Sequence, residues 1–260
     1  YLDDDFMIMT IIKNIYRYPV KGLSAEALSE THLHACSSLQ DDRRFAIALG
    51  STNLDLNNRG WMPKKHFLMQ AKNPKLTQLE TKYDHDTQTL TLLRRGKQVS
   101  RGQLSSPIGR TMIEDFLTAF MGDEARGCVK IFETQTGEML SDQSKPFVSL
   151  INLASVRDIG RVTGMELDPI RFRGNFYFES DAPWLENNWL DKTFNLGGAT
   201  LKVIAPVGRC VATHVNPETS KHDVNILKSL QSAFGHTNCG VFAEIVQTGT
   251  VQTNDVIKII

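Results

Sequence analysis

Five consecutive residues, from Arg171 to Asn175, place two guanidinium groups and an amide within one short stretch. If this stretch is extended, Arg171, Arg173 and Asn175 project from one face, because side chains alternate along a strand. Phe172 would then point into a core. Since guanidinium groups bind phosphate through paired hydrogen bonds, the pattern indicates an anion site. A solvated strand face paired with nearby carboxylates is the alternative.

A second candidate is the turn at Lys21 and Gly22, which follows an apparent strand ending at Pro19. Glycine lets the backbone approach a ligand closely, and free N–H groups in such a turn can hold an anion. An ordinary turn without a ligand is the alternative.

Cys210 is a third candidate. It follows Arg209 and comes just after a strand that we expect to end near Pro206 and Gly208. An adjacent guanidinium favours the thiolate, which is the form that attacks an electrophile or binds a soft metal. A small buried hydrophobic residue is the alternative.

Two Cys and His pairs offer other chemistry. Cys210 with His214 and His236 with Cys239 could form a zinc site, although 21 residues separate the pairs. His236 and Cys239 could instead serve as base and nucleophile of a hydrolase, provided that the fold brings them together.

The composition limits the class of protein. The 260 residues carry 29 Lys and Arg against 29 Asp and Glu, a balance that argues against a nucleic-acid-binding protein. No run is apolar for the roughly 18 residues that a membrane helix needs, and the acidic start does not resemble a signal peptide. We therefore expect a cytoplasmic protein that contacts no membrane. Four scattered cysteines predict neither a disulfide scaffold nor an iron–sulfur cluster in this chain.

The elements that must position these residues are mostly strands. Strand patterns cover 11–18, 43–49, 76–83, 87–93, 128–132, 175–179, 199–205, 241–247 and 256–260. Helical spacing covers 108–120, 150–159 and 224–234. The first of these helices is predicted to begin with Ser106 as N-cap and Pro107 in its first turn, and to end at Gly122. The fold class is therefore mixed and β-dominated (α+β), with a β-barrel-like domain over 7–125 and a second β-barrel with peripheral helices over 126–260.

Several motifs together resemble one family. The ordered set is Tyr18 to Gly22, Asp42 to Phe45, Arg171 to Asn175 and Gly208 to Cys210, followed by Val215 to Thr219, Phe234-Gly235 and Thr248-Gly249. It resembles the MOSC family, in the arrangement of an N-terminal MOSC β-barrel domain followed by a MOSC domain. Within that family it is most similar to the YcbX-like proteins and the mitochondrial amidoxime-reducing component.

The resemblance implies a molybdenum cofactor of the molybdopterin form. It assigns Cys210 as metal ligand and catalytic residue. The residues that it implies for cofactor binding are Lys21, Gly22, Leu23, Arg44, Asn152, Ser155, Arg171, Arg173, Asn175 and Arg209.

The implied reaction is the reduction of N-hydroxylated compounds by removal of oxygen, a detoxification chemistry that acts on amidoximes, hydroxylamines and N-hydroxylated bases. The electrons would come from a separate flavoprotein, ferredoxin or cytochrome. Alternatively, they would come from a C-terminal ferredoxin domain that is missing from this sequence. The alternative is a module that carries the cofactor or sulfur without reducing a substrate.

Overall fold

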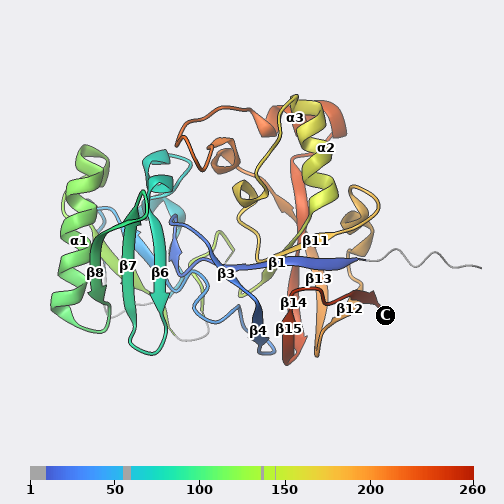
Figure 1. Cartoon of the computed structure of the whole chain (residues 1–260), viewed down its shortest axis with the longest axis horizontal. Helices are drawn as coiled ribbons and strands as arrows, with labels where there is room; N and C mark the ends of the chain where they lie inside the picture. Colours follow the sequence, from blue (N-terminus) through green and yellow to red (C-terminus); the bar gives the residue numbers. More distant parts are fainter. Residues whose placement is uncertain (1–9, 55–59, 136–137, 144) are drawn as a thin grey trace, which may run out of the picture.

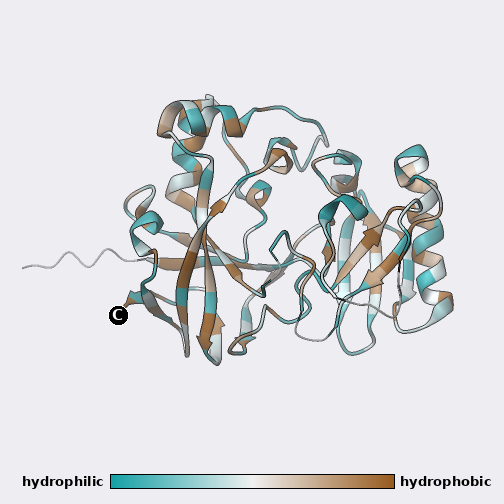
Figure 2. Cartoon of the chain, turned by 180° about the vertical axis from the view of Figure 1, so that it is seen from behind, coloured by the Kyte–Doolittle hydropathy of each residue, from teal (hydrophilic) through white to brown (hydrophobic). Residues whose placement is uncertain are grey.

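The computed structural model describes residues 10–54, 60–135, 138–143 and 145–260. Strands dominate it, with one long helix at one end of the molecule and two further helices above the sheet of the other half (Figure 1). Hydrophobic residues concentrate on the strands, whereas loops and outer helix faces are more hydrophilic (Figure 2). The structure therefore confirms the predicted β-dominated α+β class.

One large sheet forms the centre of the fold. Its eight strands run in the order β16 (Ile257–Ile259), β12 (Thr193–Leu196), β13 (Ala199–Gly208), β14 (Asn238–Gln247), β10 (Val148–Asn152), β11 (Phe176–Glu179), β1 (Ile11–Arg17) and β3 (Glu26–Leu28). Neighbouring strands are antiparallel except β10 and β11, which run parallel. A short ribbon of β4 (Glu30–Leu33) and β15 (Gly249–Gln252) lies beside this sheet.

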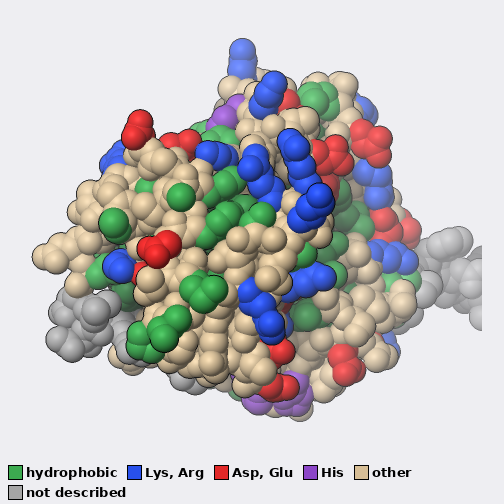
Figure 3. Space-filling view, turned by 60° about the vertical axis from the view of Figure 1, so that its left-hand side comes forward, with side chains coloured by type: hydrophobic (Ala, Val, Ile, Leu, Met, Phe, Trp, Pro, Cys, Tyr) green, Lys and Arg blue, Asp and Glu red, His purple; other side chains and the backbone are tan. Residues whose placement is uncertain are grey.

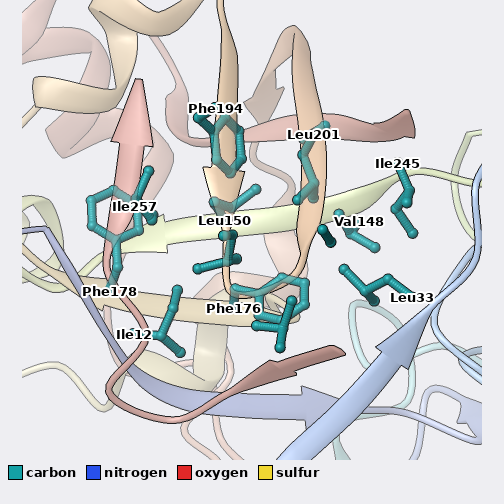
Figure 4. Close-up of a cluster of buried hydrophobic side chains, with 14 of the residues drawn as sticks. Ile12, Leu33, Val148, Leu150, Phe176, Phe178, Phe194, Leu201, Ile245 and Ile257 are labelled. Carbon is teal, nitrogen blue, oxygen red and sulfur yellow. The ribbon is translucent and has the colours of Figure 1, made fainter. Parts of the chain in front are cut away.

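The large sheet encloses the main hydrophobic core. Figure 4 shows the side chains of Leu150, Phe176 and Phe194 pointing toward one another from three strands. All three are fully buried. Burial of apolar surface on this scale is the main favourable contribution to folding.

Two smaller sheets form the other half. One contains β2 (Val20–Lys21), β5 (Phe45–Ala48) and β9 (Lys130–Glu133), and the other contains β6 (Glu80–Asp84), β7 (Thr89–Arg94) and β8 (Lys97–Gln103). Helix α1 (Pro107–Met121) packs on β8 at the edge of the molecule. As predicted, Ser106 is the N-cap of α1, and its Oγ accepts a 3.0 Å hydrogen bond from the Gly109 N–H. Gly122 is the C-cap at the other end of the helix.

Helices α2 (Leu153–Thr163) and α3 (Ile226–Phe234) pack together against the large sheet. The predicted helix 150–159 was placed too early, because all five residues of β10 are buried. A strand that is buried on both faces shows no alternation, so its apolar run merged with the helix pattern that follows. In the part of the chain that the structure describes, six short 3-10 helices complete the fold: η1 (Lys64–His66), η2 (Pro74–Gln78), η3 (Gly122–Ala125), η4 (Pro169–Phe172), η5 (Leu185–Trp189) and η6 (Val211–His214).

Two predicted strands need further correction. The stretch 76–83 begins within η2, and only its second part belongs to β6. The strand predicted over 199–205 continues to Gly208 as β13, with shifts of register against β14 around Ala205 and Pro206. Such irregular pairing accommodates a proline that cannot donate a ladder hydrogen bond.

The chain passes between the two halves more than once. Strand β1, from the predicted domain 7–125, pairs with β11 of the large sheet. Strand β9, from the predicted domain 126–260, pairs with β5. The division between residues 125 and 126 stays a prediction. Within the described ranges, no helix combines the length and apolar character needed to cross a membrane.

Candidate functional site

A cavity of about 490 Å³ lies where segments from both halves of the sequence meet. Its wall includes Lys21 and Gly22 at the end of β2, the stretch 69–72, and residues 139 and 141–143. The second half of the chain contributes 171–173, Asn175 and 207–213. The cavity therefore brings together the three motifs that the sequence singled out.

The wall is strongly cationic although the whole chain has a formal charge of +0. Among the described residues, seven Lys and Arg side chains line the cavity against a single carboxylate, that of Asp142. The seven are Lys21, Arg43, Lys64, Lys72, Arg171, Arg173 and Arg209. Figure 3 shows Lys and Arg side chains gathered in a band down the middle of one face. A concave surface with charges of one sign concentrates ligands of the opposite sign, here anions.

The stretch 171–175 is not extended, so the condition under which its side chains would share one strand face is not met. Arg171 and Phe172 end η4, whose N-cap Asp168 accepts a 2.9 Å hydrogen bond from the Ile170 N–H. Arg173 then adopts a left-handed conformation with φ 50°. Arg171, Arg173 and Asn175 reach one cavity because the backbone turns, and not because side chains alternate.

Arg171 is a buried cation with one unused donor. Its two terminal nitrogens donate to Asp223, whereas its Nε has no hydrogen-bond partner within the described structure. A buried donor without a partner costs free energy unless a ligand or water accepts from it.

Arg173 stacks on the ring of Tyr18, with 4.3 Å from its Cζ to the ring centroid. It donates to the Leu23 carbonyl at 2.9 Å and forms no ion pair within the described ranges. Burial lowers the pKa of this guanidinium, because the protein interior solvates the charged form less well than water does. Arg43 is paired with Asp42 and lies 4.7 Å from the centroid of the same ring.

Lys21 is held in place at the cavity wall. Its Nζ donates to the Leu140 carbonyl at 2.8 Å and to Asp142 Oδ1 at 3.0 Å. Burial lowers the pKa of Lys21, and Asp142 opposes that shift. The next residue, Gly22, has φ +87°, and a Cβ added there would lie 3.2 Å from the Leu68 carbonyl oxygen. Glycine is therefore required for the turn that presents Lys21.

Cys210 lines the cavity from an irregular stretch between β13 and η6. Its thiol is half-buried, and its carbonyl accepts a 3.0 Å hydrogen bond from the Thr213 N–H. Arg209, directly before it, donates to the carbonyls of Phe172 (2.7 Å) and Cys239 (2.8 Å). This arginine joins η4 to β14 and so fixes the backbone that presents the thiol.

Asn175 is buried and links several parts of the wall. Its Oδ1 accepts from the backbone N–H and the hydroxyl of Ser149, both at 3.0 Å. Its Nδ2 donates to Asp42 at 3.1 Å and to the Tyr16 carbonyl at 3.2 Å. Both ends of the amide are therefore engaged in holding the wall together.

Four other predicted cofactor residues do not line the cavity. Leu23 is fully buried in the N-terminal core, and Arg44 pairs with Asp41 and Glu133. Asn152 and Ser155 both donate to the buried carboxylate of Glu186, at 2.9 Å each. Their assignment to a cofactor stays a prediction.

Arg43, Lys64, Lys72 and Asp142 line the cavity but were not among the site residues predicted from the sequence. Arg43 stands beside Arg44 in the motif from Asp42 to Phe45, and only the turn before β5 decides which guanidinium lines the cavity. Lys64 and Asp142 have no distinctive local pattern, so the sequence offered no signal for them.

The alternatives based on His and Cys pairs find no support. The described residues contain no group of three or more His, Cys, Asp or Glu side chains placed to hold a metal ion, which contradicts the four-residue zinc site. His214 Nε2 instead accepts from the Leu227 N–H at 3.3 Å. Burial raises the pKa of Cys239 to about 12, which makes this thiol a poor nucleophile for a hydrolase.

The cavity suits an anionic group that carries a soft metal. It offers one thiol among the described lining residues, that of Cys210, together with the cationic wall and the unpartnered Nε of Arg171. Thiolates are preferred ligands of soft metal centres, and guanidinium groups are preferred partners of phosphate. The donors present therefore fit a phosphate-bearing metal cofactor.

Comparisons with known structures and proteins add weak likenesses. The match with the YUAD protein from Bacillus subtilis covers 97% of this chain and 96% of that protein, at 11% identity and a TM-score of 0.43. For YiiM from Geobacillus stearothermophilus the identity is 14% and the TM-score 0.33, and for YiiM from Escherichia coli they are 15% and 0.34. Each of these two matches covers 44% of this chain and 53% of the YiiM chain. This chain therefore spans about half the length of the YiiM proteins. Comparison with curated proteins returned no match.

Family models give the decisive result. The model described as MOSC N-terminal beta barrel domain matches residues 9–129, and the model described as MOSC domain matches residues 139–258. Together they span nearly the whole chain, in the order that the motifs predicted. The chain belongs to the MOSC family, which is generally linked to binding of the molybdenum cofactor.

Proposed function

We propose that this protein binds the molybdopterin form of the molybdenum cofactor in the cationic cavity and reduces N-hydroxylated compounds. The observation that carries the proposal is the position of Cys210, which among the described residues is the one thiol on a wall with seven cationic side chains. A separate electron-donor protein, or a ferredoxin domain outside this sequence, would supply the electrons.

The residues divide into three roles. Lys21, Arg171 and Arg173 bind the anionic groups of the cofactor, because each places a buried or half-buried cation on the wall. Cys210 supplies the thiolate ligand. Arg209 and Asn175 keep these groups in place through hydrogen bonds to the surrounding backbone.

When bound, the cofactor supplies two-electron oxygen-atom transfer chemistry. This chain orients the cofactor and the substrate beside Cys210. Amidoximes, hydroxylamines and N-hydroxylated bases are the proposed substrates, in a detoxification role.

The test is to measure molybdenum by elemental analysis and pterin by fluorescence after oxidation, on wild type, Cys210→Ser and Cys128→Ser. Cys128 is exposed and lies outside the cavity, so its variant controls for the loss of any thiol. We expect equimolar metal and pterin in wild type and in Cys128→Ser, and loss of metal in Cys210→Ser with an unchanged circular dichroism spectrum. Wild-type protein without pterin would refute the proposal.

Turnover decides between the reductase and the carrier alternative. Loaded protein is mixed with benzamidoxime and a chemically reduced viologen dye, which replaces the electron-donor protein. Formation of benzamidine supports the reductase. Full cofactor content without turnover of any N-hydroxylated compound would favour the carrier.

A further inference from the structure

Asp142 is the single carboxylate that lines the cavity among the described residues, and two lysines share it. Lys21 Nζ donates to Oδ1 and Lys64 Nζ donates to Oδ2, both at 3.0 Å. Each carboxylate oxygen has two acceptor positions, so both retain capacity for a further donor.

The two lysines differ in how firmly they are held. The Lys21 side chain is 10% exposed and also bonds to the Leu140 carbonyl, whereas the Lys64 and Asp142 side chains are each 48% exposed. An exposed ion pair contributes little free energy, because water solvates both partners well. Lys64 can therefore leave Asp142 at low cost and open Oδ2 to a ligand.

The carboxylate also belongs to the same chamber as the proposed metal ligand, since Asp142, Lys64 and Cys210 all line it. The hydrogen bond with Asp142 raises the pKa of Lys64, and the sulfur of Cys210 acts in the same direction. Burial opposes the charge of Asp142, but Lys21 and Lys64 lower its pKa overall, so the carboxylate is ionised at neutral pH.

A cationic wall repels a cationic ligand, and the amidine that reduction of an amidoxime produces is a cation at neutral pH. An amidine presents two parallel N–H donors from one planar group, the same arrangement with which arginine binds carboxylates. Such a ligand needs a carboxylate on the wall, and within the described lining Asp142 alone provides one.

We infer that Asp142 binds the amidine group that reduction of an amidoxime produces, after Lys64 moves away, and so determines the affinity of the cavity for basic products. This inference rests on the proposed function and names the class of product that the cavity would bind best. A purely structural role, in which Asp142 only neutralises Lys21 and Lys64, makes different predictions.

The experiment compares the binding of benzamidine and of benzamide, its uncharged counterpart, by isothermal titration calorimetry. The proteins are wild type, Asp142→Asn, Lys64→Ala and the control Asp115→Asn, which changes an exposed carboxylate on α1. Molybdenum and pterin are measured on the same samples. We expect wild type and Asp115→Asn to prefer benzamidine by about tenfold, the size of one charge-assisted contact.

Asp142→Asn should remove this preference without loss of pterin. Lys64→Ala should strengthen benzamidine binding several-fold, because it removes the competitor for Oδ2 and one positive charge. An unchanged preference in Asp142→Asn, or weaker benzamidine binding in Lys64→Ala, would overturn the inference. Loss of pterin from Asp142→Asn with the preference retained would do the same and would assign Asp142 to cofactor retention. Absence of molybdenum and pterin from wild type is the separate result that refutes the proposed function.

Discussion

Arg171 and Asp223 form a two-point ion pair, with NH1 2.8 Å from Oδ1 and NH2 2.7 Å from Oδ2. Arg171 belongs to η4, and Asp223 lies in the loop between η6 and α3. Asn216, from that same loop, donates to the second oxygen of Asp223 at 2.7 Å. The pair therefore fastens the cavity arginine to the loop between η6 and α3, and determines which guanidinium nitrogen remains unpartnered.

Replacing Asp223 with Asn should destabilise the protein and alter its acid response. Arg171 would stay buried without its counter-charge, at a cost of about 2 kcal/mol given that Asp223 is partly exposed. The hydrogen bond with Arg171 lowers the pKa of Asp223. The contribution of the ionised Asp223 to the free energy of unfolding is therefore complete above the unfolded pKa of about 3.9. It is lost as the pH falls through the lower pKa of the folded state.

Urea denaturation of wild type and Asp223→Asn, at pH 7 and through the acid range, checks this. The free-energy gap between the two proteins should narrow as the pH falls below about 4. A gap that stays constant with pH would contradict the ion-pair explanation.

Replacing Arg209 with Lys should cost more than its conservative character suggests. Lysine cannot reach the carbonyls of Phe172 and Cys239 together, and each buried carbonyl left unpaired costs about 1–3 kcal/mol. Arg161→Lys, on an exposed side chain of α2, should change the unfolding free energy by less than about 0.5 kcal/mol. Equal effects of the two changes in chemical denaturation would show that Arg209 does not hold this backbone.

Ser155→Ala separates a structural role from a cofactor contact. The Ser155 hydroxyl donates to the buried Glu186, so its loss should lower the unfolding free energy by about 1–3 kcal/mol. Pterin content per folded chain should remain that of wild type, because Ser155 lies outside the cavity wall. Reduced pterin at unchanged stability would instead support the cofactor contact that the family resemblance implies.

The cysteines should differ in their reaction with iodoacetamide at pH 8. Cys36 and Cys128 are exposed and should be alkylated with or without cofactor. Cys239 should stay unmodified in the folded protein, because burial raises its pKa to about 12. Cys210 should react only after the cofactor is removed. Mass spectrometry of tryptic peptides measures the alkylation of all four cysteines. Modification of Cys210 in protein fully loaded with cofactor would contradict its role as metal ligand.

The sequence predicted the local elements well where the signal is local. Ser106, Pro107 and Gly122 mark the ends of α1 because capping depends on a few neighbouring residues. It failed between Arg171 and Asn175, where alternating residues matched a strand but Asp168 and Pro169 begin a 3-10 turn. It also failed at β10, where burial of both faces removed the alternation.

By itself the sequence determined the family, the β-dominated class and the motifs that supply Lys21, Arg173 and Cys210, since residue types and their order along the chain carry that information. Only the tertiary structure decided which residues share the cavity. It brought in Lys64 and Asp142 and placed Asn152 and Ser155 on Glu186 instead. The physical reason is that the cavity is formed by contacts between segments far apart in sequence, and a charged side chain is directed by the partner that the fold places beside it.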